Sequence, residues 1–190
     1  MDFILTIDRA LFRIINQSLS NPLFDQIMPL FDQTKYFIPL LLFPWLLAVF
    51  YDKKNRWKLA TLIPLVIILA DQSGLLLKKT ILRPRPFVDI DPELINHLIH
   101  PKGQNYSFPS NHAANTAALA TIFSSVYARY KTIFWSLAVL VMISRIYIGV
   151  HYPGDVLAGF LLGTLSAMIL LKGWDAINTR NTKTIHNQVN

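Results

Sequence analysis

Apolar residues gather in five long segments that are separated by shorter polar stretches. The segments cover residues 36–51, 59–77, 113–128, 132–150 and 156–174. A helix needs about 20 mostly apolar residues, within a range of about 17–25, to cross a bilayer. The first segment is short and contains Pro39 and Pro44, which membrane helices tolerate because neighbouring helices satisfy the freed backbone groups. The pattern predicts an all-α, polytopic membrane helical bundle with about five transmembrane helices.

Residues 1–33 follow a different pattern. Apolar residues recur at helical spacing and polar residues lie opposite them: Ile4, Ile7, Leu11, Ile14 or Ile15 and Leu19 on one side, Asp8, Arg9, Arg13 and Gln17 on the other. This pattern indicates an amphipathic helix in the membrane interface, although a helix that packs on the bundle fits it equally well. We expect a single domain over residues 1–178, with 1–33 as an interfacial segment, 78–110 as a long loop and 179–190 as a polar tail.

Composition supports the membrane interpretation. Hydrophobic residues make up 53% of the chain and charged residues 15%, whereas soluble domains carry about 25% charged residues. The chain has no cysteine, which excludes disulfides, thiolate catalysis and cysteine-bound metals. The net charge of +7 lies mainly at the ends of the apolar segments. That placement suits lipid headgroups or an anionic substrate and gives no reason to expect nucleic-acid binding.

Three polar clusters interrupt the apolar pattern at the ends of segments. The first is "KKTILRPRP", which places Lys78 and Arg85 after the second segment. The second is "PSNH", residues 109–112, directly before the third segment. The third is "SRIYIGVHYPGD", which places Arg145, His151 and Asp155 between the fourth and fifth segments. Because successive spans alternate in direction, we expect all three clusters at the same membrane surface.

Taken singly, most of these residues have ordinary structural interpretations. Lys78 and Arg85 fit interfacial anchors whose charges reach the headgroups, and Ser110 and Asn111 fit a helix N-cap. Arg145 is harder to explain in this way. It lies within an apolar run, where an arginine costs at least about 2.5 kcal/mol and usually has a function.

Together the clusters indicate phosphate chemistry. Three cations, Lys78, Arg85 and Arg145, would converge with the N-terminus of the helix that follows Ser110, and such a helix end binds phosphate through free backbone amides. Two histidines supply a nucleophile and a proton donor, and a carboxylate accompanies one of them. The spacing of the histidines and Asp155 is not that of a metal site. The residues therefore predict phosphoryl transfer without a metal or other cofactor.

The same residues resemble the three signature motifs of the type 2 phosphatidic acid phosphatase family. The matching stretches are Lys78-x6-Arg85-Pro86, Pro109-Ser110-Asn111-His112 and Ser144-Arg145-x5-His151-x3-Asp155. They come in the order of the family and extend from Lys78 to Asp155. One departure is Asn111, where the family most often has glycine. This departure bears on substrate fit, because it places a side chain near the phosphate.

The resemblance implies a role for each matching residue. His151 would attack phosphorus and form a phosphohistidine, and Asp155 would orient its ring. His112 would protonate the leaving oxygen and then help to activate water. The phosphate oxygens would be bound by Lys78, Arg85, Ser110, Arg145 and the backbone amides of Asn111 and His112.

The resemblance also implies a location and a set of substrates. Bacterial members of the family that resemble this chain have the active site on the periplasmic or outer surface of the inner membrane. This implies that residues 78–110 form a periplasmic loop and that the "DKKNRWK" loop and the tail of residues 179–190 are cytoplasmic. Candidate substrates are undecaprenyl diphosphate, which the compact size favours, then the 1-phosphate of lipid A, then phosphatidylglycerophosphate. An anion-binding transporter without turnover and a vanadate-dependent haloperoxidase are the alternatives of other classes.

Two further features fall within the apolar segments. For Asp71, a carboxylate in the second segment, we expect a structural role. Gly159 and Gly163 form a GxxxG pattern in the fifth segment, for which we expect only a role in helix packing.

Overall fold

The computed structural model describes residues 2–99 and 106–189, and within them the chain is helical, with no β-strand. Five helices form the bundle: α3 (Thr34–Tyr51), α4 (Arg56–Ile81), α6 (Asn111–Val126), α7 (Lys131–Tyr147) and α8 (Pro153–Val189). Each contains most of one predicted apolar segment, in the predicted order, so the all-α bundle is confirmed. Helix α8 continues to Val189, beyond the residue-179 boundary that the sequence indicated.

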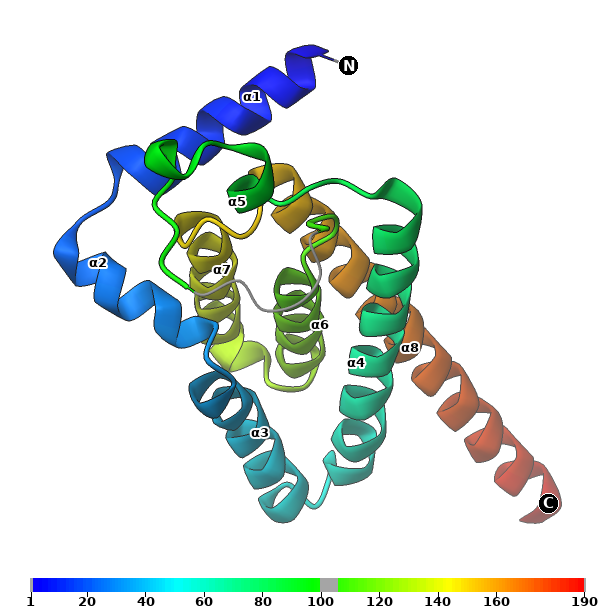
Figure 1. Cartoon of the computed structure of the whole chain (residues 1–190). Coiled ribbons are helices and arrows are strands. Elements are labelled where there is room, and N and C mark those ends of the chain that lie inside the picture. The colour runs from blue at the N-terminus through cyan, green and yellow to red at the C-terminus, as the bar shows by residue number, and fades with distance from the viewer. Residues whose placement is uncertain (1, 100–105, 190) are drawn as a thin grey trace.

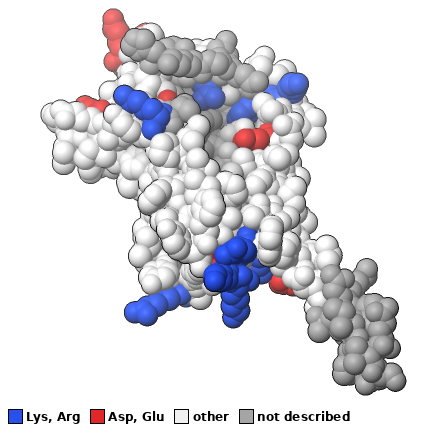
Figure 2. Space-filling view, turned by 90° about the horizontal axis from the view of Figure 1, so that it is seen from below, with Lys and Arg blue, Asp and Glu red and all other residues white. Residues whose placement is uncertain are grey.

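Among the described residues, three helical stretches are long and apolar enough to cross a membrane: Arg56–Ile81, Ala128–Tyr147 and Pro153–Thr179. The apolar part of α3, Ile38–Tyr51, is shorter. Helix α6 has 16 residues, which gives it a length of about 24 Å at 1.5 Å per residue. Figure 2 shows a band of mostly uncharged side chains between basic residues at the two ends of the molecule, as expected for a membrane protein.

Helix α6 lies inside the bundle, between α4, α7 and α8 (Figure 1). Its small side chains, among them Ala113 and Ala117, are fully buried. Helix α8 approaches it through Gly159 and Gly163, the two glycines of the GxxxG pattern. A Cβ atom on Gly163 would lie 1.9 Å from the carbonyl oxygen of Ala114, so only glycine permits this approach. The predicted packing role of the pattern is confirmed.

The N-terminal segment forms four short elements: α1 (Asp2–Arg13), a π-helix (Ile14–Ser18), α2 (Pro22–Ile27) and a 3-10 helix (Met28–Phe31). Helix α1 crosses one end of the bundle, close to α5 (Figure 1). Its buried face is the stripe of Asp8 and Phe12, continued by Asn16, and these residues are 8%, 0% and 0% exposed. The apolar residues Phe3 and Ile4 are 77% and 72% exposed. The segment therefore packs on the bundle with a stripe of one aromatic and two polar residues, and leaves most of its predicted apolar side exposed.

The connection between α4 and α6 contains α5 (Pro86–Asp89) and a 3-10 helix (Pro92–Leu94). The sequence "PELINHLI" predicts a short helix over residues 92–99, and this prediction is wrong beyond Leu94. Asp91 caps the start as expected, since its carboxylate accepts a hydrogen bond from the Glu93 amide at 3.1 Å. Tertiary contacts then replace the helix: the Asn96 amide donates to the Asn16 side chain at 2.9 Å, and Ile95 packs on the core.

Candidate active site

Three helix ends meet at the end of the bundle that α1 covers. Lys78 lies in the last turn of α4, Ser110 precedes α6, and Asp155 lies in the first turn of α8. His151 lies in the turn that joins α7 to α8. The three polar clusters of the sequence are thus brought to one place, as the alternation of the spans predicts.

His151 and Asp155 form a buried pair. The Nδ1 atom of His151 lies 3.6 Å from Oδ2 of Asp155, and the two side chains are 4% and 0% exposed. The same Oδ2 accepts a hydrogen bond from the Tyr152 amide at 2.8 Å, which fixes the carboxylate. A carboxylate facing Nδ1 favours the tautomer with the proton on Nδ1 and leaves Nε2 as the nucleophilic nitrogen. That Nε2 lies 3.3 Å from the Nη1 atom of Arg85.

The environment of His151 keeps its imidazole neutral. Burial, assisted by the positive charge of Arg85, lowers the pKa of His151 to about 4, although Asp155 opposes the shift. Since a protonated imidazole has no lone pair with which to attack phosphorus, this shift keeps His151 in the form that a nucleophile requires at neutral pH.

The basic side chains are held by buried oxygens. Lys78 is 5% exposed, and its Nζ donates to the backbone carbonyl oxygens of Ser107, at 3.4 Å, and of Pro109. The Nη1 atom of Arg85 donates to the carbonyl of Val150 at 3.1 Å. Arg145 is 1% exposed, and an ion pair of 2.6 Å joins its Nη1 to Asp32. Burying Lys78 and Arg145 beside the half-buried Arg85 is costly unless anions compensate their charge.

The N-terminus of α6 points into the same region. The Ser110 side chain caps the helix by accepting from the Ala113 amide at 3.5 Å, and the Ser110 amide donates to the Asp155 carbonyl at 3.0 Å. The amides of the first helical turn have no partner within the helix and suit an anion. Burial, together with the charges of Arg145, His151, Arg85 and Lys78, lowers the pKa of His112 well below its usual value. Both histidines of the motifs therefore lie among the same basic side chains at the start of α6.

The chain matches a known family over most of this region. Residues 57–178 match the model of the PAP2 superfamily, and this range contains all three motifs. The chain belongs to the PAP2 superfamily.

Relatives and solved structures of PAP2 proteins agree with this assignment. The "Lipid A 4'-phosphatase" of Porphyromonas gingivalis is 29% identical over 182 residues, which are 90% of this chain and 75% of that protein. An "Undecaprenyl-diphosphatase" of Sulfolobus acidocaldarius is 36% identical over 122 residues, 63% of this chain and 55% of the relative. The crystal structure of Aquifex aeolicus LpxE has a TM-score of 0.70 and 31% identity, with 86% of this chain and 93% of that chain covered. The predicted enzyme class, a membrane-bound lipid phosphatase, is confirmed.

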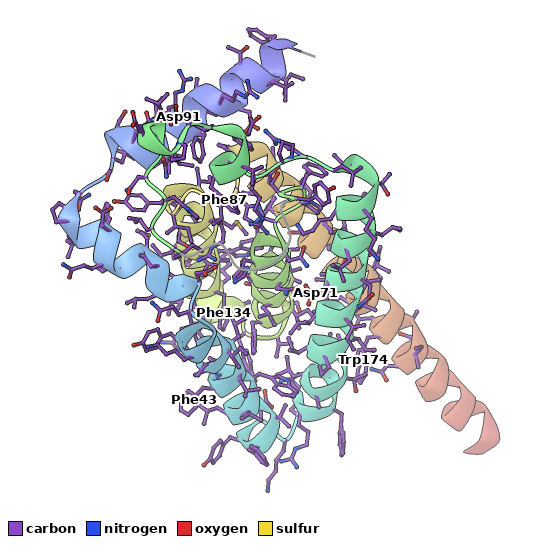
Figure 3. All side chains as sticks on the ribbon, viewed as in Figure 1. Phe43, Asp71, Phe87, Asp91, Phe134 and Trp174 are labelled. Carbon is purple, nitrogen blue, oxygen red and sulfur yellow. The ribbon has the colours of Figure 1, made fainter. Side chains whose placement is uncertain are left out.

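Asn111 replaces the usual glycine of the second PAP2 motif, and its side chain has a structural partner. The Nδ2 atoms of Asn111 and Asn115 both lie 3.1 Å from Oδ1 of Asp71, which extends from α4 toward α6 (Figure 3). Gly74 leaves the room for this arrangement, since a Cβ there would lie 2.7 Å from the Asn111 side-chain oxygen. The structural role expected of Asp71 is therefore to tie α4 to the start of α6.

Sequence reasoning missed three charged residues that contact this PAP2 site. Arg83 binds Asp155, Asp8 binds Arg83, and Asp32 binds Arg145. Arg83 lies within the first motif, from which only Lys78 and Arg85 are predicted as site residues. Asp8 and Asp32 precede the matched region and show no local signal, because only the fold brings them to the motifs.

Proposed function

We propose that this protein removes a terminal phosphate from a membrane lipid through a covalent phosphohistidine on His151. The observation that carries the proposal is the buried pair of His151 and Asp155, whose outer nitrogen lies 3.3 Å from Arg85 beside the N-terminus of α6. A nucleophile in its neutral form, with a carboxylate behind it and a cation in front, is the arrangement that attack on a phosphate requires.

The reaction proceeds in two displacements. Nε2 of His151 forms a bond to phosphorus while the bond from phosphorus to the lipid oxygen breaks. His112, which is protonated once the negative charge of the bound phosphate has raised its pKa, gives its proton to that oxygen. In the second step, neutral His112 takes a proton from water as the water oxygen attacks phosphorus. The bond from phosphorus to Nε2 then breaks and releases inorganic phosphate. Asp155 stabilises the positive charge that His151 carries between the steps.

The phosphate oxygens are bound by side chains and amides from four elements. Lys78, Arg85 and Arg145 supply positive charge, and Arg145 adds the geometry of a guanidinium fork. The Ser110 hydroxyl and the amides of Asn111 and His112 complete the binding site at the start of α6. These groups stabilise the charge of the transition state, and the proposal includes no metal or other cofactor.

The proposed location is the bacterial inner membrane, with the site at the periplasmic or outer surface. The uncharged band of Figure 2 supports a site near one membrane surface. The opposite end carries the short loop with Lys53 and Lys54, and positive charge in short loops favours the cytoplasmic side. Helix α1 would lie in the interface on the periplasmic side, with Phe3 and Ile4 in contact with lipid.

Two lipid substrates are supported by separate observations. A phosphate of lipid A is supported by the Porphyromonas gingivalis relative, because that match extends over nearly the whole chain. Undecaprenyl diphosphate is supported by the small size of the chain and by the Sulfolobus acidocaldarius relative. Both substrates present a terminal phosphate at a membrane surface, and phosphatidylglycerophosphate is the third to be tested.

The test measures phosphate release by the purified protein in detergent, with EDTA present and the three lipids offered separately. We expect release from one of them, loss of release in His151→Ala, and a labelled phosphoenzyme that is stable to base and labile to acid. His97→Ala is the matched control, because His97 stacks on Phe87 with ring centres 4.6 Å apart and contributes no predicted chemistry. Equal release by wild type and His151→Ala, or binding of all three lipids without turnover, would overturn the proposal.

A further inference from the structure

Arg83 is directed toward Asp155, although it lies only two residues from Arg85. Its Nη1 donates to Oδ1 of Asp155 at 2.8 Å, while its Nη2 donates to Oδ2 of Asp8. The guanidinium also lies over the ring of Tyr152, with its central carbon 4.1 Å from the ring centre. Burial opposes the charged form, yet the two carboxylates raise the pKa of Arg83 above its usual value. Arg83 is therefore a permanent cation between two carboxylates.

Asp8, on helix α1, also binds the chain next to Asp155. Its second oxygen, Oδ1, accepts a hydrogen bond from the Gly154 amide at 2.7 Å, directly before Asp155 in the chain. Asp8 is 8% exposed, although it belongs to a helix whose other side is uncovered. A Cβ on Gly154 would lie 3.2 Å from Asp8 and 3.4 Å from Arg83, so the three residues are closely packed.

We propose that Asp8 and Arg83 are positioning residues for the phosphatase reaction, through which helix α1 holds Asp155 in the orientation that His151 requires. The proposal rests on the function proposed above, since it assigns to these residues the control of the catalytic pair. Neither residue touches the phosphate: each acts through Asp155.

The hydrogen bonds of the Asp155 carboxylate support this positioning role. Each oxygen of Asp155 has a fixed partner, with Arg83 on Oδ1 and the Tyr152 amide on Oδ2. Oδ2 is thereby held on the side that faces Nδ1 of His151. Without Arg83, the carboxylate would lose one of these two anchors and would be free to rotate, and the imidazole would lose its orientation.

The charges of Asp155, Arg83 and Asp8 support the same role. Arg83 alone would neutralise Asp155 and remove the negative charge that stabilises a positively charged His151. Asp8 adds a second carboxylate, so the group of three keeps one net negative charge behind the imidazole. The two residues therefore have opposite electrostatic effects on His151, although loss of either one impairs the reaction.

The test compares Arg83→Gln, Asp8→Asn and the control Arg9→Gln. Arg9 neighbours Asp8 on α1 and forms an ion pair of 2.9 Å with Asp89, but its side chain is 56% exposed and does not touch Asp155. With lipid A and undecaprenyl diphosphate in mixed micelles, we expect kcat to fall about 10- to 100-fold in Arg83→Gln and about 10-fold in Asp8→Asn. KM should stay within about threefold, Arg83→Lys should regain part of kcat, and Arg9→Gln should resemble wild type.

A second readout follows the pKa of His151 by NMR, without substrate. The other charged groups facing His151 are unchanged in every variant: Asp155 on α8, Lys78 on α4, His112 on α6, and Arg85 in the α4–α5 connection. Removing the Arg83 cation should raise the pKa of His151, whereas removing the Asp8 anion should lower it. A merely structural role would not give opposite shifts.

The outcomes separate this proposal from the function on which it rests. Unchanged kcat in both Arg83→Gln and Asp8→Asn, or an equal loss in Arg9→Gln, would refute the positioning role. Shifts of the His151 pKa in the same direction would refute the charge argument. If wild type released no phosphate from any lipid, the proposed function would fail, while the NMR measurement would still decide whether Asp8 and Arg83 act on His151.

Discussion

The close approach of α8 to α6 is expected to control catalysis as well as stability. A Cβ atom on Gly159 would lie 2.3 Å from the carbonyl oxygen of Ser110, whereas side-chain carbons in proteins hardly ever come closer than 3.0 Å. Gly159→Ala must therefore separate the two backbones by about 0.7 Å, the difference between these distances, because a carbonyl in the helix cap cannot turn aside. Ser110 caps α6, and its amide is bonded to the backbone of Asp155.

The displacement acts on the reacting groups themselves. It moves the α6 amides and His112, which lie on one side of the phosphate, away from His151 and Asp155 on the other. A misplacement of about 1 Å costs about 100-fold in rate, so a shift of this size should lower kcat by about 10- to 100-fold. Overpacking should also destabilise the protein by about 1–3 kcal/mol.

Gly173→Ala is the matched control for this experiment, because no atom lies within 4 Å of a Cβ at that position of the same helix. It should leave kcat unchanged, because the added methyl group displaces no neighbour. It should not lower stability, because alanine is favoured over glycine in a helix. The assay is phosphate release at saturating lipid, with thermal unfolding measured on the same samples. If Gly159→Ala kept kcat within twofold of Gly173→Ala, the conclusion that this contact sets the geometry of the site would be wrong.

Two further predictions concern charges at the site. Asp32→Asn should leave the buried charge of Arg145 without its counter-ion and should therefore lower the melting temperature. Because Asp32 no longer competes for Arg145, inorganic phosphate should bind about 10-fold more tightly and should restore the melting temperature. A variant whose melting temperature does not respond to phosphate would contradict this expectation. Because the pKa of His151 is lowered to about 4, its neutral form persists well below pH 6.5, so the acidic limb of kcat/KM due to this group should fall near pH 4. A midpoint near 6.5, assigned to His151 by NMR, would contradict that expectation.

Most of the helical bundle could be predicted because the membrane imposes simple rules on sequence. Long, nearly uninterrupted apolar segments have few alternatives to a helix, and each became one. The connection between α4 and α6 follows no such rule. Asp91 and Pro92 form a typical helix start, but Ile95 then packs on the core and the Asn96 amide binds Asn16. The sequence alone does not show these tertiary contacts.

The site was predictable where its residues lie at the ends of successive helices. Lys78, Ser110 and His151 are far apart in sequence, yet the alternation of spans alone places them at one surface. Side-chain direction was not predictable. The side chain of Asn111 donates a hydrogen bond to the Asp71 carboxylate in α4 at 3.1 Å. No sequence pattern in either helix predicts this contact.

Residues 1–33 precede the part of the chain that matches the PAP2 family, yet they supply two carboxylates to the site. Asp8 binds Arg83, and Asp32 binds Arg145. Removing one partner of a buried ion pair typically costs about 3–5 kcal/mol, because the remaining charge has been taken out of water without compensation. The family region by itself would thus retain its motifs but leave the buried Arg145 without its counter-ion and the half-buried Arg83 with Asp155 alone. On this argument the N-terminal segment helps to hold the charged side chains of the proposed site in place, besides any contact of α1 with lipid.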